Sequence, residues 1–323
     1  MRYQREKCVM NEKRAGQFIY IAYIPFLCLM ALITVFSSSV SGAVLDSLIM
    51  CGKILIPSIF PYLVISGVLV KTGFAEFFGD VCGSIISHVT GFNKNASAAV
   101  VTGMICGFPS GAASACGIMK SGGISENEAK YLIPACSMAS PGFTVFAVGV
   151  NMLGSFGRGV FLYFTQVAVS LAVGSLFYGK QRRKAVSEAR CSMRESMGVL
   201  GAFTSSLSEA IGTMVSICGT VIFFSVIAGV AASAAFLPVA VKTVLASVLE
   251  LSTGCAAICS ILSGDAAFAA VSAAVGWTGL SVFAQTTAVG EKAVSGKIYI
   301  AEKLVCSLLC AVITYAAAKF GFV

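Results

Sequence analysis

The chain has too few charged residues to cover a water-facing surface. Asp, Glu, Lys and Arg make up 11% of its 323 residues, and hydrophobic residues make up 57%. A soluble domain carries about a quarter charged residues, so this composition excludes a soluble globular protein. Long, largely apolar stretches recur at 18–40, 54–70, 160–177, 211–236 and 298–318. Each is near or above the roughly 18–20 residues that cross a hydrocarbon core. The sequence therefore predicts an all-α polytopic membrane protein.

The chain also lacks the residues of a metal centre. His88 is its single histidine, and none of its 13 cysteines form a Cys-x-x-Cys pair. Because most of these cysteines lie inside apolar runs, we expect them to be packing residues, and we expect no metal and no cofactor. There is no P-loop, and no predicted span holds a histidine that could act as a base. An enzyme is therefore the least expected class.

The net charge of +8 does not indicate a nucleic-acid partner. The basic residues lie in short loops beside apolar spans, which is the positive-inside pattern of membrane topology. On this basis the basic N-terminus, 1–17, and the basic linker, 180–204, are predicted to be cytoplasmic. The apolar run at 18–40 is too long for a signal-peptide core. We therefore predict that it is a retained first transmembrane span.

An even number of full crossings must separate these two cytoplasmic segments. Five apolar segments lie between them: 18–40, 46–70, 96–119, 127–150 and 157–178. The segment 96–119 is the one predicted not to cross, because glycine and proline interrupt it at 107–111. Broken backbone at membrane depth must be enclosed by protein or line a cavity. We therefore predict a re-entrant hairpin that enters from the cytoplasm.

The second half of the chain has a similar layout. The predicted full spans are 211–235, 266–288 and 298–318, and 241–262 is a second hairpin interrupted at 250–254. The total is about seven transmembrane helices plus two re-entrant hairpins, with the C-terminus outside. In this topology Lys292, Lys297 and Lys303 are cytoplasmic, and no Arg or Lys lies inside a span to hold a carboxylate.

One further segment, 74–90, is predicted to be an amphipathic helix on the membrane surface. Phe77, Val81 and Ile85 share its apolar face with other aromatic residues, opposite Glu76 and Asp80. His88 falls near the polar side, so we expect it to have an interfacial role.

The two halves resemble each other in sequence. Residues 140–147 align with 277–284, residues 109–112 align with 252–255, and a weaker match joins 66–69 to 228–231. The matches keep their order along the chain, which indicates an internal duplication. The predicted topology inverts the second repeat, 205–320, relative to the first, 41–179. Many secondary transporters have this architecture, with the substrate between discontinuous helices near the membrane midplane.

Four helix breaks in paired positions form the candidate site: 107–111, 140–142, 251–254 and 277–279. Helix N-termini there would present N–H groups and partial positive charge to an anion, and hydroxyls would add hydrogen bonds. The alternative is that Gly and Pro only kink helices and let them pack closely. The predicted substrate-binding residues are Gly107, Pro109, Ser110, Gly111, Ser140, Pro141, Gly142, Ser252, Thr253, Gly254, Thr278, Gly279 and Gln285.

Glu250 is the most informative single residue, because an acid within an apolar segment is costly and indicates function. It could bind a coupling proton or sodium ion, or contact the substrate directly. Asp265 is a weaker candidate at a predicted span end. Glu209 is expected to cap the start of its helix, and Arg158 is expected to anchor an outer loop.

Four motifs resemble a known family. They are Leu-Ile-Pro-Ser-Ile-Phe-Pro-Tyr at 55–62, Gly-Phe-Pro-Ser-Gly-Ala at 107–112, Ser-Pro-Gly-Phe at 140–143 and Phe-Ala-Val-Gly at 146–149. They resemble the YlbJ-type sporulation integral membrane proteins. Those proteins carry the nucleoside recognition, or Gate, domain and are similar in design to concentrative nucleoside transporters. The resemblance covers roughly residues 40–320.

The resemblance implies alternating-access transport of dipicolinic acid across the outer forespore membrane during endospore formation. Two alternatives stay open at this point. The chain could be a relative that carries another substrate, with Glu250 contacting a nucleoside or another neutral or cationic solute. It could also be a membrane scaffold that transports nothing. The expected partners are a small-molecule substrate, a coupling ion and membrane lipid, and a homo-oligomer is possible.

Overall fold

The computed structural model describes residues 23–179, 197–233, 236–290 and 293–322, without the side chains of 75, 76, 78–80 and 232. Within these ranges the regular structure is helical and contains no strand, which confirms the all-α prediction. The basic N-terminus, most of the basic linker and Lys292 lie outside the described residues. The same is true of the Glu76 and Asp80 side chains.

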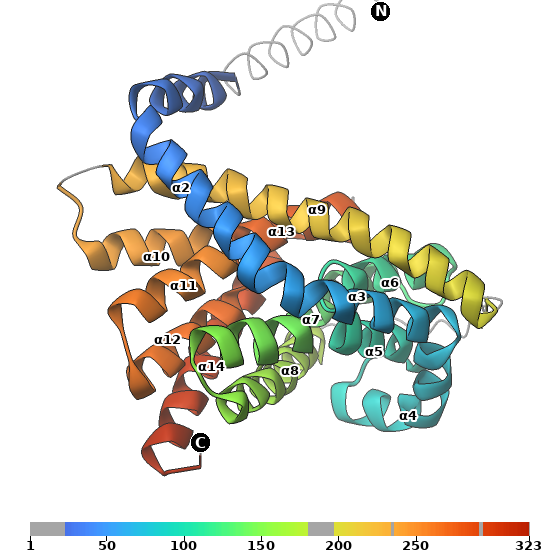
Figure 1. The fold of residues 1–323 in the computed structure, drawn as a ribbon. Coiled ribbons are helices and arrows are strands. Elements are labelled where there is room, and N and C mark those ends of the chain that lie inside the picture. The colour runs from blue at the N-terminus through green and yellow to red at the C-terminus, as the bar shows by residue number, and fades with distance from the viewer. Residues whose placement is uncertain (1–22, 180–196, 234–235, 291–292, 323) are drawn as a thin grey trace, which may run out of the picture.

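The helices follow one another with short connections (Figure 1). A helix at Tyr23–Val35 precedes α2 (Ser37–Met50), η1 (Cys51–Leu55), α3 (Ile56–Lys71), α4 (Phe74–Thr90), η2 (Lys94–Ala96), α5 (Ser97–Cys106), α6 (Ser110–Lys120), α7 (Glu126–Cys136), η3 (Gly142–Met152) and α8 (Phe156–Gly179). The second half has α9 (Val199–Ala232), α10 (Val239–Leu249), α11 (Leu251–Ile261), α12 (Gly264–Trp277), α13 (Gly279–Gly290) and α14 (Gly296–Lys319).

Five helices of the described chain are long and apolar enough to cross a membrane, rather than about seven. They are Ser37–Lys71, Phe156–Gly179, Val199–Ala231, Gly264–Gly290 and Gly296–Lys319. These helices make the chain an integral membrane protein.

The predicted spans at 18–40 and 127–150 are not continuous helices. The first helix break falls at Phe36, inside the predicted first span, and α2 then continues through η1 into α3. The second predicted span is divided at 137–140, directly before Pro141, because proline disfavours helical backbone in the residue before it. Ser140 carries that restriction.

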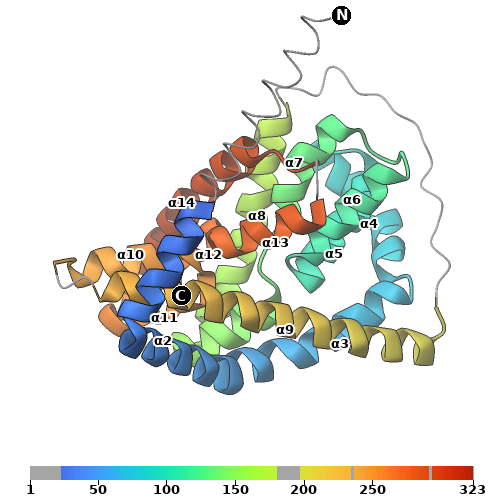
Figure 2. The same cartoon turned by 90° about the horizontal axis from the view of Figure 1, so that it is seen from above.

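Two long helices lie side by side along one edge of the molecule, α2–α3 and α9 (Figure 2). They run antiparallel. The Cα of Gly67, near the end of α3, packs against Ser206 near the start of α9, and Gly229 near the end of α9 packs against Ala43 in α2. A Cβ at Gly67 would stand 3.0 Å from the Ser206 Cβ, so glycine permits this approach.

Contacts between the other helices follow the same correspondence between halves. The hairpin α5–α6 has its counterpart in α10–α11, and the broken pair α7–η3 has its counterpart in α12–α13. Helix α6 contacts α13, and α11 contacts η3. Likewise α7 contacts α14, and α12 contacts α8. These reciprocal contacts agree with two related halves, and the inversion of one half relative to the other stays a prediction.

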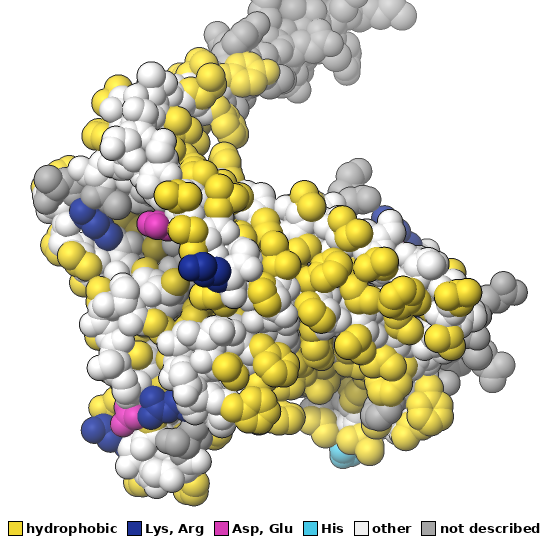
Figure 3. Space-filling model, in the orientation of Figure 1, with side chains coloured by type: hydrophobic (Ala, Val, Ile, Leu, Met, Phe, Trp, Pro, Cys, Tyr) yellow, Lys and Arg dark blue, Asp and Glu magenta, His cyan; other side chains and the backbone are white. Residues whose placement is uncertain are grey.

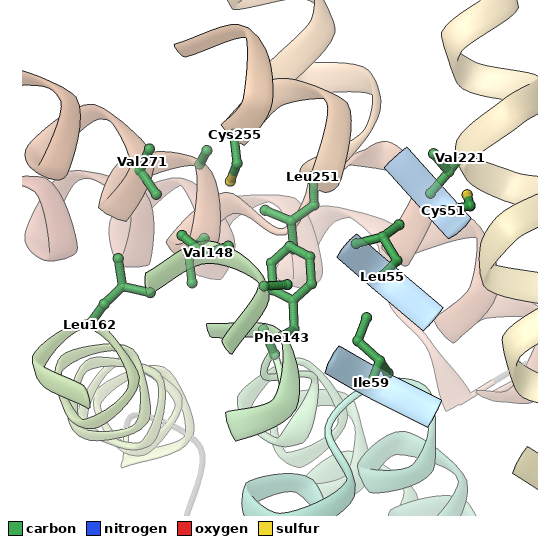
Figure 4. Packing of buried hydrophobic residues seen from close by; sticks show 14 of the residues in the cluster. Cys51, Leu55, Ile59, Phe143, Val148, Leu162, Val221, Leu251, Cys255 and Val271 are labelled. Carbon is green, nitrogen blue, oxygen red and sulfur yellow. The ribbon is translucent and has the colours of Figure 1, made fainter. Parts of the chain in front are cut away.

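The largest hydrophobic cluster joins the two halves (Figure 4). Leu55 and Ile59 come from the first long helix, Phe143 from η3, and Leu251 and Val271 from the second half. Each of these side chains is at most 4% exposed. The halves are therefore joined by a shared apolar core rather than by surface contacts alone.

The face of the molecule in Figure 3 is mostly hydrophobic, with charged side chains in a few small groups. Helix α4 presents Phe77, Val81, Ile85 and Val89 outward, each at least 60% exposed. An exposed apolar face on an amphipathic helix suits the predicted position at the membrane interface. His88 is exposed on the same helix, as that position allows.

Two charged residues differ in environment from the sequence expectation. Glu209 lies inside α9, ten residues after the helix starts at Val199, and pairs with Lys71 at 2.6 Å. It therefore does not cap the helix. Lys303 is 1% exposed inside α14, so it is neither in an aqueous loop nor absent from the spans. The positive-inside rule places a lysine near the end of a span in water, because the rule uses charge counts alone. It cannot detect a hydrogen-bond partner buried elsewhere in the fold.

Candidate functional site

The first half contributes two helix breaks that touch each other. Gly107 ends α5 with φ of 74°, and the Phe108–Pro109 peptide bond is cis before α6 begins. Residues 137–140 between α7 and η3 are not helical, and the Phe108 N–H donates to the Met138 carbonyl at 2.8 Å. A Cβ at Gly107 would stand 2.7 Å from the Ser140 nitrogen. Only glycine fits both this backbone conformation and this approach.

The second half has a matching pair of breaks. Glu250 has extended backbone between α10 and α11, and Thr278 has left-handed backbone with φ of 69° between α12 and α13. Gly279 follows with φ of 83°, and a Cβ there would stand 3.1 Å from the Leu251 nitrogen. The Trp277 indole N–H donates to the Val248 carbonyl at 3.1 Å. These contacts hold the two breaks together, as in the first half.

A cavity lies between the two pairs of breaks. The cavity is small in this conformation, with about 30 Å³ open to a water-sized molecule. Its lining comes from α3, the four broken elements and α9: Ile59, Leu63, Cys106, Phe108, Ser140, Phe143, Ile217, Val221, Glu250, Leu251, Ser252, Ser281, Val282 and Gln285. Figure 4 shows Ile59, Phe143 and Leu251 from these walls. A mostly apolar cavity with a few polar groups is typical of a small-molecule site.

Four polar side chains in the cavity wall are buried: Ser140, Glu250, Ser252 and Ser281. Ser140 is 6% exposed, and its hydroxyl accepts from the Phe143 N–H at 3.3 Å. Ser281 is 1% exposed, and its hydroxyl has no hydrogen-bond partner among the described residues. A buried hydroxyl without a partner is costly. A solute in the cavity could satisfy it.

Glu250 is 4% exposed and occupies the N-terminus of α11. Its carboxylate accepts from the Thr253 N–H at 2.6 Å, and the Thr253 hydroxyl lies 3.0 Å from the Ser225 hydroxyl of α9. A carboxylate at a helix N-terminus is stabilised by the helix dipole. The negative charge of Glu250 therefore lies at a helix break where the sequence predicted that an anionic substrate would bind. None of the cavity-lining residues is Lys or Arg.

The structure brings four of the predicted residues to the cavity wall: Ser140, Glu250, Ser252 and Gln285. The others lie outside this lining: Gly107, Pro109, Ser110, Gly111, Pro141, Gly142, Thr253, Gly254, Thr278 and Gly279. Several of these permit close packing, which is the alternative reading of such residues. A Cβ at Gly111 would overlap the Cys136 carbonyl oxygen, and one at Gly254 would overlap the Ser247 Cα. The role of each as a binding residue stays a prediction.

Sequence reasoning missed much of the lining. Phe108 lies within the predicted break 107–111 and Ser281 lies within the aligned segment 277–284, and these positions were the available signal. The walls from α3 and α9, such as Ile59 and Val221, have no local signal, because any apolar residue of a long span could face a cavity. Only the packing of the two long helices selects them.

Residues 53–156 match the family model Gate, described as nucleoside recognition. The match covers α3 to the start of α8 and includes the first pair of breaks. No curated protein and no solved structure matches the chain. The matched segment is 104 of 323 residues, counted from 53 to 156 inclusive. The chain is an integral membrane protein whose first half resembles a Gate, or nucleoside recognition, domain.

Proposed function

We propose that the chain is a secondary transporter that binds a small solute in the cavity between its halves. One observation carries the proposal: helix breaks from both halves surround a cavity whose wall contains a buried acid and a buried hydroxyl that has no partner among the described residues. Discontinuous helices that surround a site between two related halves are the architecture of many secondary transporters. The Gate match in the first half agrees with this class.

Connections between the halves offer elements that could change during transport. Arg158 of α8 pairs with Asp265 of α12 at 2.9 Å, and Lys71 of α3 pairs with Glu209 of α9 at 2.6 Å. Each pair joins one half to the other and is partly exposed. Such pairs can break when one half moves against the other around a fixed site, which is how alternating access operates.

The cavity wall favours a neutral solute that donates hydrogen bonds. Glu250 accepts hydrogen bonds, and Ser140, Ser281 and Gln285 can donate or accept. A nucleoside has hydroxyl and amide donors for these groups and an apolar base face for Phe108. A dicarboxylate would place two negative charges beside Glu250 without a cationic side chain in the lining, which is costly in a low-dielectric site.

Dipicolinic acid is the second candidate, because the sequence motifs resemble the sporulation family. Its carboxylates could use the N-terminus of η3, where Ser140 precedes the first turn. In this version the protein acts at the outer forespore membrane and Glu250 carries a proton when the substrate binds. The third candidate, a membrane scaffold, has no use for a polar cavity between the halves.

The test is counterflow in liposomes that contain the purified protein. Vesicles loaded with unlabelled uridine or dipicolinate are diluted into the same radiolabelled compound, and uptake of label is followed. We expect rapid exchange of uridine in the wild type, a slower rate in Ser281→Ala, and the wild-type rate in the matched control Ser260→Ala. Ser260 is exposed on α11 and bonds only to its own helix at Ala257. Exchange of dipicolinate alone would favour the second candidate, and exchange of neither compound would contradict both.

A further inference from the structure

Two adjacent charged residues are buried in the last long helix. Glu302 is 0% exposed and Lys303 is 1% exposed, and both lie in α14. Acidic and basic side chains within a membrane helix are costly, and they generally face the protein interior for a functional reason. Neither residue lines the cavity between the halves.

Lys303 supports the break between α7 and η3. Its ammonium group donates to the Ser137 carbonyl at 2.7 Å, at the start of the non-helical segment 137–140. Gln166 of α8 supports the middle of the same segment, because its amide donates to the Ala139 carbonyl at 2.6 Å. The end of this segment is Ser140, which lies in the cavity wall. Lys303 is therefore connected to the candidate site through four residues of backbone.

Lys303 is also close to the second inner break. Its Nζ lies 5.9 Å from the centre of the Tyr299 ring, an arrangement that favours a positive charge. The Tyr299 hydroxyl lies 3.5 Å from the Thr278 hydroxyl in the break between α12 and α13. The Ser137 and Thr286 hydroxyls, also 3.5 Å apart, join the same two regions. A single ammonium group thus lies between the inner breaks of both halves.

Glu302 contrasts with its neighbour, because neither of its carboxylate oxygens has a hydrogen-bond partner among the described residues. A Cβ at Gly174 of α8 would stand 3.3 Å from one of them, so the carboxylate faces α8 where a larger residue would restrict it. A charged carboxylate without partners in such a site costs far more than a neutral one. A bound proton removes most of that cost.

Few titratable groups surround Glu302 on the packed helices. Its own helix contributes Lys303 and Cys306, and α7 contributes Cys136. From α8, Gly174 faces the carboxylate. The single acid of α12, Asp265, is in that helix's first turn and pairs with Arg158, whereas Gly276 at the other end packs against Cys306. Lys303 is therefore the charged group that can stabilise an ionised Glu302.

We infer that Glu302 is a proton-binding site, and that loss of its proton moves Lys303 away from the 137–140 segment. This inference rests on the proposed transport function and assigns its coupling ion. With the proton bound, Glu302 is neutral and Lys303 holds the Ser137 carbonyl. When the proton leaves, the carboxylate becomes the strongest acceptor near the ammonium group. The ammonium group then turns from the Ser137 carbonyl toward the ionised carboxylate.

The consequence of this exchange reaches the cavity. Release of the Ser137 carbonyl removes one support of the 137–140 segment, while Gln166 keeps the other. Ser140 at the end of the segment can then shift relative to Glu250 and Ser281 across the cavity. Proton binding at one position and solute binding at another are coupled through a backbone segment that both contact.

The first test is independent of the transported solute. Infrared difference spectra of the purified protein in lipid nanodiscs are recorded during titration to alkaline pH. We expect a carboxylic-acid carbonyl band that disappears as Glu302 ionises and that is absent from Glu302→Gln. The matched control, Glu209→Gln, changes an exposed acid of α9 and should keep the band. An identical band in wild type and Glu302→Gln, or no such band at any pH, would overturn the inference.

The second test separates coupling from transport in liposomes with the membrane potential clamped. A gradient of one pH unit can accumulate a neutral solute about tenfold when one proton moves with it. We expect tritiated uridine to approach this ratio in wild type and in the control Glu126→Gln, which changes an exposed acid of α7 that pairs within its own helix. Glu302→Gln should still bind and exchange uridine, but its ratio of inside to outside uridine should stay at about one, because the glutamine amide cannot release a proton.

The possible results distinguish the inference from the function on which it rests. Wild-type protein that exchanges neither uridine nor dipicolinate would contradict the proposed function and the coupling with it. Normal exchange with tenfold accumulation in Glu302→Gln would overturn only the inference. Accumulation by the wild type that follows a sodium gradient and ignores the pH gradient would overturn it as well.

Discussion

Replacing Glu250 with glutamine should change the affinity for two solute classes in opposite directions. The glutamine oxygen can still accept from the Thr253 N–H, so the N-cap of α11 is kept and the fold should persist. A solute hydroxyl that donates to a carboxylate gains about 1.5–3 kcal/mol, against about 0.5–1.5 kcal/mol for a neutral acceptor. Uridine affinity should therefore fall roughly tenfold. Alanine at this position would also remove the cap, at a cost of about 1 kcal/mol.

A dicarboxylate should respond with the opposite sign. A negative charge about 5 Å from an ionised Glu250 is repelled by roughly 3 kcal/mol at an effective dielectric constant of about 20. Removal of that charge should strengthen dipicolinate binding.

Equilibrium binding of each radiolabelled compound to purified wild type and Glu250→Gln measures both changes. Equal affinities in the two proteins for both compounds would refute the assignment of Glu250 to the site. Weaker dipicolinate binding in Glu250→Gln would refute the electrostatic argument.

Three further changes have defined outcomes. Gly107→Ala should lower the unfolding temperature in detergent. Its positive φ costs an alanine about 1–2 kcal/mol, and the alanine Cβ would also contact the neighbouring break. The control Gly117→Ala has open space around the new Cβ, so it should be neutral or stabilising. Lys303→Met should destabilise the protein by about 1–3 kcal/mol because it leaves a buried carbonyl without its donor, and unchanged thermal stability would contradict that contact. A double-mutant cycle with Arg158→Gln and Asp265→Asn should give a coupling of at most about 1 kcal/mol in the free energy of unfolding, because both side chains are partly exposed. A coupling energy several times larger would mean that the pair is desolvated.

Local sequence signals were sufficient to locate the helix breaks. Gly107 and Pro109, the Ser-Pro-Gly run at 140–142, and Gly279 each restrict the backbone in ways that do not depend on tertiary contacts. The structure places breaks at or beside all four predicted positions. The fourth break is at Glu250 itself, one residue before the range 251–254, because the acid caps α11.

The long helix from Ser37 to Lys71 could not be delimited in the same way. Serine and glycine at 37–42 favour a loop in water, and the sequence ended the first predicted span at 40 and began the next apolar segment at 46. In the structure this stretch is helical and packs against α9, with Gly229 against Ala43. Tertiary packing of small residues decides the outcome there, as is usual between membrane helices.

The burial of charge was the least predictable feature. Lys303 is near the start of a predicted span, where a basic residue normally marks the cytoplasmic side. Its hydrogen-bond partner, Ser137, is 166 residues away in the chain. Cavity walls from α3 and α9 are unpredictable for the same reason, since residues far apart in sequence form them.

The central claim is that a small solute binds between the halves, beside Ser281. The most direct measurement is equilibrium binding of tritiated uridine and radiolabelled dipicolinate to purified wild type, Ser281→Leu and the exposed control Ser260→Leu. Leucine at Ser281 should fill space in the cavity, so we predict saturable binding of one solute in wild type and Ser260→Leu and its loss in Ser281→Leu. Undiminished binding in a folded Ser281→Leu protein, or no binding of either solute to the wild type, would contradict the account.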